Sequence, residues 1–179
     1  PGLRWRLNSL NRSIGSLRHG DFGFIFARPE TGKTTFLASE ISFFSCQSSK
    51  PILWFNNEEQ GNKVQLRCYQ ALHGIELIKL FSKRDYYQQE YIAKGGNNVR
   101  IYDSANITKR LVEDYAKKYN PACIIFDQLD KLQGFSADRE DLRLGNIYIW
   151  ARELAKKYCP VIGVCQADAS AEGKRWLTM

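Results

Sequence analysis

A strand-forming run that ends in a tight loop and continues as a helix places the strongest constraint on this chain. The stretch reads IFARPETGKTTFLASE and begins at Ile25. The apolar residues at 22–26 are typical of a buried strand. Apolar residues then recur at helical spacing, at Phe36, Leu37, Ile41 and Phe44. Strand, loop, Gly-Lys-Thr and helix is the layout of a phosphate-binding loop, where backbone N–H groups at a helix N-terminus face an anion.

The loop departs by one residue from the usual pattern G-x-x-x-x-G-K-[ST], because Ala27 stands at the first glycine. Gly32 remains where the chain must turn sharply. Lys33 can reach the β- and γ-phosphates of a nucleotide, and the Thr34 hydroxyl can bind magnesium. A strand-to-helix turn that contains Gly-Lys-Thr by chance stays open as an alternative from this stretch alone.

A second acidic site follows the apolar strand in CIIFDQLD, which runs directly into Asp127. The C-terminal end of a buried parallel strand lies at the crevice where such sheets bind ligands. In phosphate-loop proteins an acid at this place holds magnesium together with the loop hydroxyl, here Thr34. The alternative is an aspartate that caps a helix.

Polar side chains also end two other predicted strands. In LWFNNEEQ, Glu58 and Glu59 are both candidates for a general base that polarises the attacking water. Neighbouring positions point in different directions, so we expect only one of them to face the nucleotide. The alternative is a helix N-terminus that carries acids. In PVIGVCQADAS, the Gln166 amide can hydrogen-bond a γ-phosphate.

The rest of the chain alternates between strand and helix patterns. We expect strands at 22–27, 51–55, 99–102, 122–127 and 160–165. We expect helices at 33–47, 60–73, 108–119 and 142–158, one or two short helices within 76–95, and a short helix that ends near Gly15. This alternation predicts an α/β fold with a mostly parallel sheet flanked by helices.

Composition limits the class of protein. The chain has 179 residues, enough for one α/β domain, and 44% of them are apolar and 25% charged, as in an ordinary globular protein. The chain contains no run of about 18 apolar residues, so we expect no membrane span. The first residues do not resemble a signal peptide, so we expect a cytoplasmic protein without a membrane partner. Five widely spaced cysteines favour reduced thiols. A net charge of +7 favours an anionic partner.

Taken together, these motifs resemble the ATPase core of DnaB-type replicative DNA helicases, in the RecA-like branch of the P-loop NTPases. That family's loop reads A-R-P-x-x-G-K-T, and its second strand ends in F-S-L-E-M. The resemblance favours Glu58 over Glu59 as the catalytic glutamate, and it implies Asp127 as the magnesium-site acid and Gln166 as the γ-phosphate sensor. It implies ATP binding by Ala27, Arg28, Pro29, Glu30, Thr31, Gly32, Lys33, Thr34 and Thr35.

The resemblance further implies an enzyme that couples ATP hydrolysis with Mg²⁺ to translocation on single-stranded DNA, as a hexameric ring with an arginine finger from a neighbouring subunit. The matching DNA loops are 132–140 and 168–175, with Phe135, Arg139, Lys174 and Arg175 as contacts and Trp176 as a further stacking candidate. FNNEEQ is more polar than the family pattern and is similar to phage-encoded members, which leaves a bacterial or a host cytoplasm open.

The resemblance covers nearly the whole chain, so we expect residues 1–179 to form a single core truncated at its C-terminal end, with 1–20 as a lead-in linker and short helix. On its own the chain is then expected to be monomeric and weakly active. A RecA-like recombinase or a switch ATPase on DNA is the main alternative. A module that binds nucleotide only for assembly is another. A small-molecule kinase is disfavoured, because no arginine-rich lid segment follows the long helix.

Overall fold

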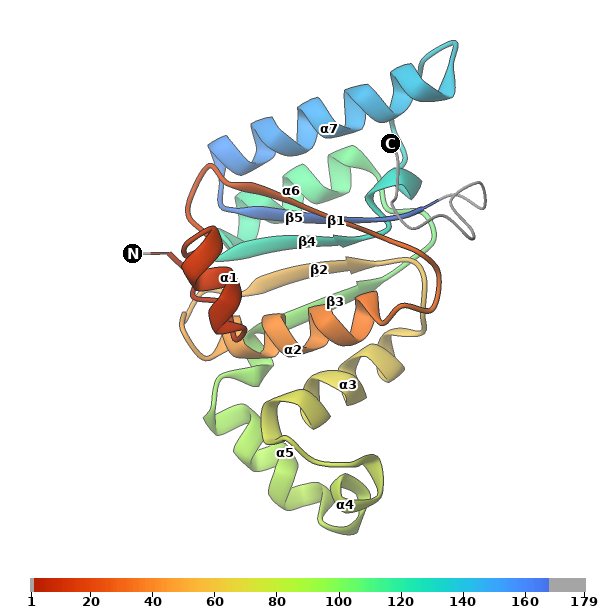
Figure 1. Cartoon of the computed structure of the whole chain (residues 1–179). Helices are drawn as coiled ribbons and strands as arrows, with labels where there is room; N and C mark the ends of the chain where they lie inside the picture. The colour runs from red at the N-terminus through yellow and green to blue at the C-terminus, as the bar shows by residue number, and fades with distance from the viewer. Residues whose placement is uncertain (1, 168–179) are drawn as a thin grey trace.

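The computed structural model describes residues 2–167, which form a three-layer α/β arrangement (Figure 1). The described strands are β1 (Phe22–Ala27), β2 (Ile52–Asn56), β3 (Val99–Asp103), β4 (Cys123–Asp127) and β5 (Val161–Gln166). They pair in parallel in the order β1-β5-β4-β2-β3. The register places Ala27 opposite Gln166 and Asn56 opposite Asp127. The carboxyl ends of these four strands therefore meet at one edge of the sheet.

Helices cover both faces of the sheet, which confirms the predicted fold class. The helices α2 (Lys33–Ser45) and α3 (Gly61–His73) lie on the same face as α1 (Asn8–Ser13), and α6 (Lys109–Tyr119) and α7 (Glu140–Lys157) lie on the other (Figure 1). Two further helices extend beyond α3, namely α4 (Leu77–Ser82) and α5 (Arg84–Ala93). Short 3₁₀ turns are η1 (Gly96–Asn98) and η2 (Leu129–Lys131).

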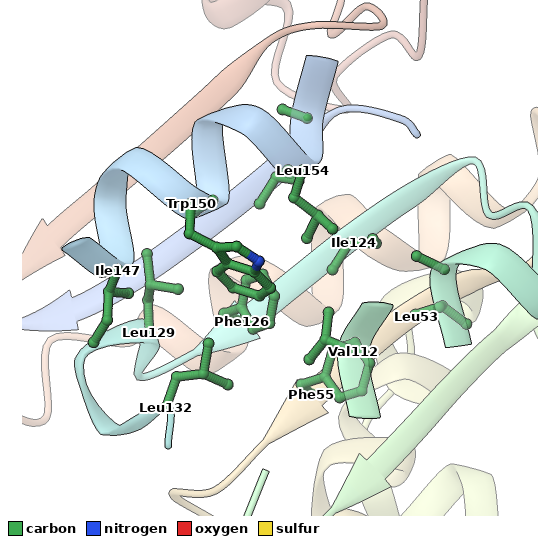
Figure 2. Close-up of a cluster of buried hydrophobic side chains, with 14 of the residues drawn as sticks. Leu53, Phe55, Val112, Ile124, Phe126, Leu129, Leu132, Ile147, Trp150 and Leu154 are labelled. Atoms are coloured by element: carbon green, nitrogen blue, oxygen red, sulfur yellow. The ribbon is translucent and has the colours of Figure 1, made fainter. Parts of the chain in front are cut away.

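Each buried strand supplies side chains to two cores, because successive residues point to opposite faces. In β2, Leu53 and Phe55 join the cluster under α6 and α7, whereas Trp54 joins the cluster under α2 and α3. Figure 2 shows the first cluster around Trp150. The ring centroids of Trp150 and Phe126 lie 5.8 Å apart. Burial on both faces explains why these strands read as continuous apolar runs.

Residues 5–7, within the expected linker, are packed against α2. Trp5 is buried with its ring 5.2 Å from that of Phe44. The buried Glu40 carboxylate of α2 accepts hydrogen bonds from the backbone N–H groups of Arg6 and Leu7, at 2.6 and 3.3 Å. The lead-in therefore belongs to the core of this unit.

Element boundaries differ from the expected ones by one or two residues. The helix expected at 142 begins at Glu140, because its first turn is acidic rather than apolar and suits the helix dipole. The helix expected to end at 47 ends at Ser45. Thr108 caps α6 by accepting a hydrogen bond from the Leu111 N–H at 3.2 Å. Among the helices within residues 2–167, none has the length and apolarity that a membrane span requires.

Candidate active site

The loop between β1 and α2 turns sharply before it enters the helix. Gly32, which precedes the helix, has φ 89°, and Glu30 has φ 55°, so the backbone turns through left-handed conformations twice. The Thr31 hydroxyl donates to the Arg28 carbonyl at 2.8 Å. The mostly buried Lys33 ammonium donates to the same carbonyl at 3.0 Å. The lysine is therefore folded over the loop at the place where a phosphate group would bind.

Thr34 and Asp127 meet at the end of the sheet although 93 residues separate them in the chain. The Thr34 hydroxyl donates to Asp127 Oδ2 at 3.3 Å. Asp127 is only 1% exposed, and its Oδ1 has no hydrogen-bond partner among residues 2–167. A buried carboxylate oxygen without a donor, beside a hydroxyl, fits a hard cation such as Mg²⁺ that prefers oxygen ligands.

The surroundings of Asp127 raise its pKa from 3.8 to about 6. Burial is the largest cause, and the negative charge of Glu58 adds to it. The Thr34 hydrogen bond and the Lys33 charge act in the opposite direction. The site is therefore short of positive charge around Asp127, which again fits a metal ion. Among the residues described, no group of three or more His, Cys, Asp or Glu side chains is placed to hold a metal ion.

The two glutamates after β2 lie in different surroundings. Both line a cavity of about 540 Å³ beside the phosphate loop, which differs from the expectation that only one would face it. Glu58 is exposed and affects the pKa of Asp127 more strongly than Glu59 does. Glu59 instead forms an ion pair with Arg67 at 2.9 Å. Both side chains reach the cavity because the chain turns at 57–60 instead of continuing as an extended strand.

Of the remaining predicted site residues, the structure describes Gln166, Arg139 and Phe135. Gln166 ends β5 opposite Ala27, beside the start of the phosphate loop. Arg139 is exposed and pairs with Asp141 at 2.9 Å. Phe135 is half-buried, with its ring 5.4 Å from that of Trp150 and the Lys109 ammonium over it. Lys174, Arg175 and Trp176 lie outside the described residues.

Two residues at this edge were not identified from the sequence. Arg67 on α3 lines the cavity and donates to the Thr35 hydroxyl at 2.9 Å. Asn56 is fully buried at the end of β2, and its amide N–H donates to the Glu59 carbonyl. The sequence indicated these residues only by their position. Because α3 follows the end of β2, its first turns must lie near the edge of the sheet where the carboxyl ends of the strands meet.

The sequence matches a known family over nearly its whole length. Residues 2–176 fit the family model described as the DnaB-like helicase C terminal domain. The replicative DNA helicase DnaB of Pasteurella multocida is 25% identical over 97% of this chain, and that of Haemophilus influenzae is 25% identical over 96%. The chain spans 40% of the length of each of these relatives.

Solved structures share the fold at lower identity. A DnaB-like replicative helicase, studied for its interactions with primase, superposes with a TM-score of 0.83 and 19% identity, over 98% of this chain and 46% of that one. A second solved structure, described as an ATPase domain, gives a TM-score of 0.81 and 20% identity, over 98% of this chain and 67% of that one. These likenesses confirm the RecA-like fold predicted from the sequence.

Proposed function

The chain belongs to the DnaB-like helicase C-terminal domain family, and we propose that it is the ATP-hydrolysing motor core of a replicative DNA helicase. The observation that carries the proposal is the contact between Thr34 and Asp127 at the mouth of a preformed phosphate loop. The fold thus brings a hydroxyl of the loop next to a buried carboxylate, and this supports a magnesium–nucleotide site there. Since the chain spans 40% of the relatives' length, duplex unwinding is proposed for the protein that contains it.

ATP would bind along residues 27–35. Backbone N–H groups at the start of α2 and the Lys33 ammonium would hold the β- and γ-phosphates. Lys33 would exchange its contact with the Arg28 carbonyl for a phosphate oxygen, a stronger charge-assisted hydrogen bond. This exchange needs only a side-chain movement, because the loop already has its turn at Gly32.

Thr34 and Asp127 would hold Mg²⁺, Thr34 through its hydroxyl and Asp127 through the carboxylate. When bound, the ion would neutralise charge on the phosphate oxygens. The positive charge of the ion would also compensate the buried negative charge of the Asp127 carboxylate, whose pKa is raised by burial. Asp127 Oδ1, which has no hydrogen-bond partner within residues 2–167, supports this assignment.

Glu58 would act as the general base that orients and deprotonates the attacking water. Its exposed side chain lines the cavity on the side of Asp127, and, unlike Glu59, it forms none of the ion pairs that we find among residues 2–167. Lys33 and the loop amides would stabilise charge on the transferred phosphoryl group. Gln166, at the adjacent strand end, would contact the γ-phosphate and link its presence to the loop that follows.

The whole protein would assemble as a hexameric ring on single-stranded DNA, with an arginine finger supplied by a neighbouring subunit. The loops at 132–140 and 168–175 would face the DNA, with Arg139, Lys174 and Arg175 as phosphate contacts. Phe135 is a weaker candidate for base stacking, because its ring already packs on Trp150 under Lys109. A cytoplasmic location, in a bacterium or in the host of a phage, remains a prediction.

An assay on the protein that contains this chain separates the proposal from its main alternative. We expect DNA-stimulated ATP hydrolysis and unwinding of a forked duplex. Strand exchange without unwinding would favour a recombinase. Nucleotide binding without any turnover would favour an assembly module.

Asp127→Asn should stabilise the metal-free protein at pH 8 while it weakens magnesium-dependent nucleotide binding. The folded-state pKa lies above 3.8, so the parent's unfolding free energy falls as pH rises from about 4 to about 6. An asparagine does not titrate, so the gain in unfolding free energy at pH 8 should be on the order of 3 kcal/mol. Denaturation in EDTA across pH 4–8 measures it. A variant less stable than the parent at pH 8 would contradict the proposed burial cost.

A further inference from the structure

We propose that Arg67 binds the phosphate chain of the nucleotide and that Glu59 competes with the phosphates for it. This role rests on the proposed nucleotide site and adds to it a residue that the phosphate-loop motif does not contain. Arg67 would be a binding residue, and Glu59 a built-in competitor that lowers the affinity for nucleotide.

The first support is where the guanidinium lies. Arg67 comes from the second turn of α3, and its Nη1 donates to the Thr35 hydroxyl at 2.9 Å. Thr35 directly follows Thr34 in the first turn of α2. The Arg67 cation is therefore joined to the phosphate loop itself and lines the same cavity as Lys33.

The second support is the two-pronged ion pair between Arg67 and Glu59. The Arg67 Nη2 and Nε donate to the two carboxylate oxygens of Glu59, at 2.9 and 3.2 Å. This is the fork geometry in which arginine also binds phosphate. The Arg67 side chain remains 39% exposed and that of Glu59 25%. A pair this accessible to solvent is worth little net free energy, so a polyanion can displace the carboxylate.

The third support is that the exchange leaves the backbone near Glu58 in place. The Asn56 amide N–H donates to the Glu59 carbonyl, and Asp103 Oδ2 accepts from the Gly61 N–H at 2.7 Å. The main chain on both sides of the turn is thus held by β2 and β3. Only the Glu59 side chain has to move when Arg67 changes partner.

The charges that line the cavity predict whether each substitution strengthens or weakens nucleotide binding. Its charged lining residues are the cations Lys33 and Arg67 and the anions Glu30, Glu58 and Glu59. While Glu59 holds Arg67, it cancels that cation and adds a negative charge next to the phosphates. Removing the Glu59 charge should therefore strengthen nucleotide binding, whereas removing Arg67 should weaken it.

The test titrates the protein with fluorescent ADP and with a fluorescent non-hydrolysable ATP analogue, both with Mg²⁺. Arg67→Gln should weaken binding of the analogue about 10-fold or more, the expected loss of hydrogen bonds to a charged group. Arg67→Lys keeps the charge but cannot donate two parallel hydrogen bonds. Its affinity for the analogue should lie between those of the parent and Arg67→Gln. Glu59→Gln should tighten binding roughly 3-fold at low salt, because a like charge is removed.

The matched control is Glu153→Gln, which makes the same charge change at a surface pair with Lys156 on α7. It should leave the affinity unchanged, and thermal melts without nucleotide should show that all variants are folded. If Glu59→Gln weakens binding or leaves it unchanged, or if Arg67→Gln binds like the parent, the competition is refuted and the pair is a structural clamp. If the parent itself does not bind, or Lys33→Ala binds equally well, the proposed nucleotide site fails instead.

Discussion

Replacing Lys33 with alanine should abolish ATP hydrolysis and weaken binding of magnesium–nucleotide. The ammonium is the cation folded over the loop, 3.0 Å from the Arg28 carbonyl, where it can transfer to a phosphate oxygen. A charge-assisted contact of this kind is worth about 1.5–3 kcal/mol, so affinity should fall roughly 10- to 100-fold. Turnover should fall further, because the same charge stabilises the transferred phosphoryl group. Calorimetric titration and a steady-state phosphate-release assay measure the two effects.

A surface lysine provides the control for this change. Lys117 lies in the last turn of α6 and is exposed. Lys117→Ala removes the same charge far from the loop and should leave both binding and turnover intact. If Lys33→Ala binds and hydrolyses ATP like the parent, residues 27–35 are a strand-to-helix turn and the phosphate-loop interpretation is wrong.

Glu58→Gln should retain nucleotide binding and lose hydrolysis by about 10²-fold or more, as expected when a general base is removed. The isosteric amide keeps the shape of the side chain but cannot take a proton. The experiment requires the protein that contains this chain in its DNA-stimulated state, because the effect is on turnover. Pre-steady-state phosphate release separates a slow chemical step from slow product release.

Glu59→Gln is the matched comparison, because it makes the same change one residue away. It should reduce turnover much less than Glu58→Gln, since Glu59 is held by Arg67 and contributes least to the pKa shift of Asp127. The reverse order would assign the base to Glu59 and would show that the match to the family pattern is off by one residue.

Most of the fold could be predicted because local patterns determine it. The apolar runs before Ala27 and Asp127 predicted the two strands correctly. The strand before Asp127 is buried on both faces, which requires continuous apolar side chains, whereas the strand before Ala27 is an edge strand and only half-buried. The Gly-Lys-Thr motif located the start of α2, because the turn at Gly32 requires a left-handed backbone next to a helix. In these places one stretch of sequence contains the whole signal.

The parts that could not be predicted depend on residues that are distant in sequence. Arg67 meets Thr35 across 32 positions, and nothing in either local pattern indicates that they touch. The lead-in looked like a linker, because the contact of Arg6 with Glu40 is equally non-local. Phe135 looked free to stack on a base, whereas tertiary packing places it on Trp150. Such contacts are set by how α2, α3 and α7 dock, which a single sequence does not specify.

Hydrogen exchange of the protein with and without a magnesium-bound, non-hydrolysable ATP analogue tests the central claim most directly. The account predicts slower exchange of the backbone N–H groups at 30–36, where the loop and the first turn of α2 would donate to phosphates, and at 127–129 after Asp127. It predicts little change in α5 or in the last turns of α6. Tight binding of the analogue without protection at 30–36, or with protection only outside the sheet edge that carries Ala27, Asn56, Asp127 and Gln166, would contradict it.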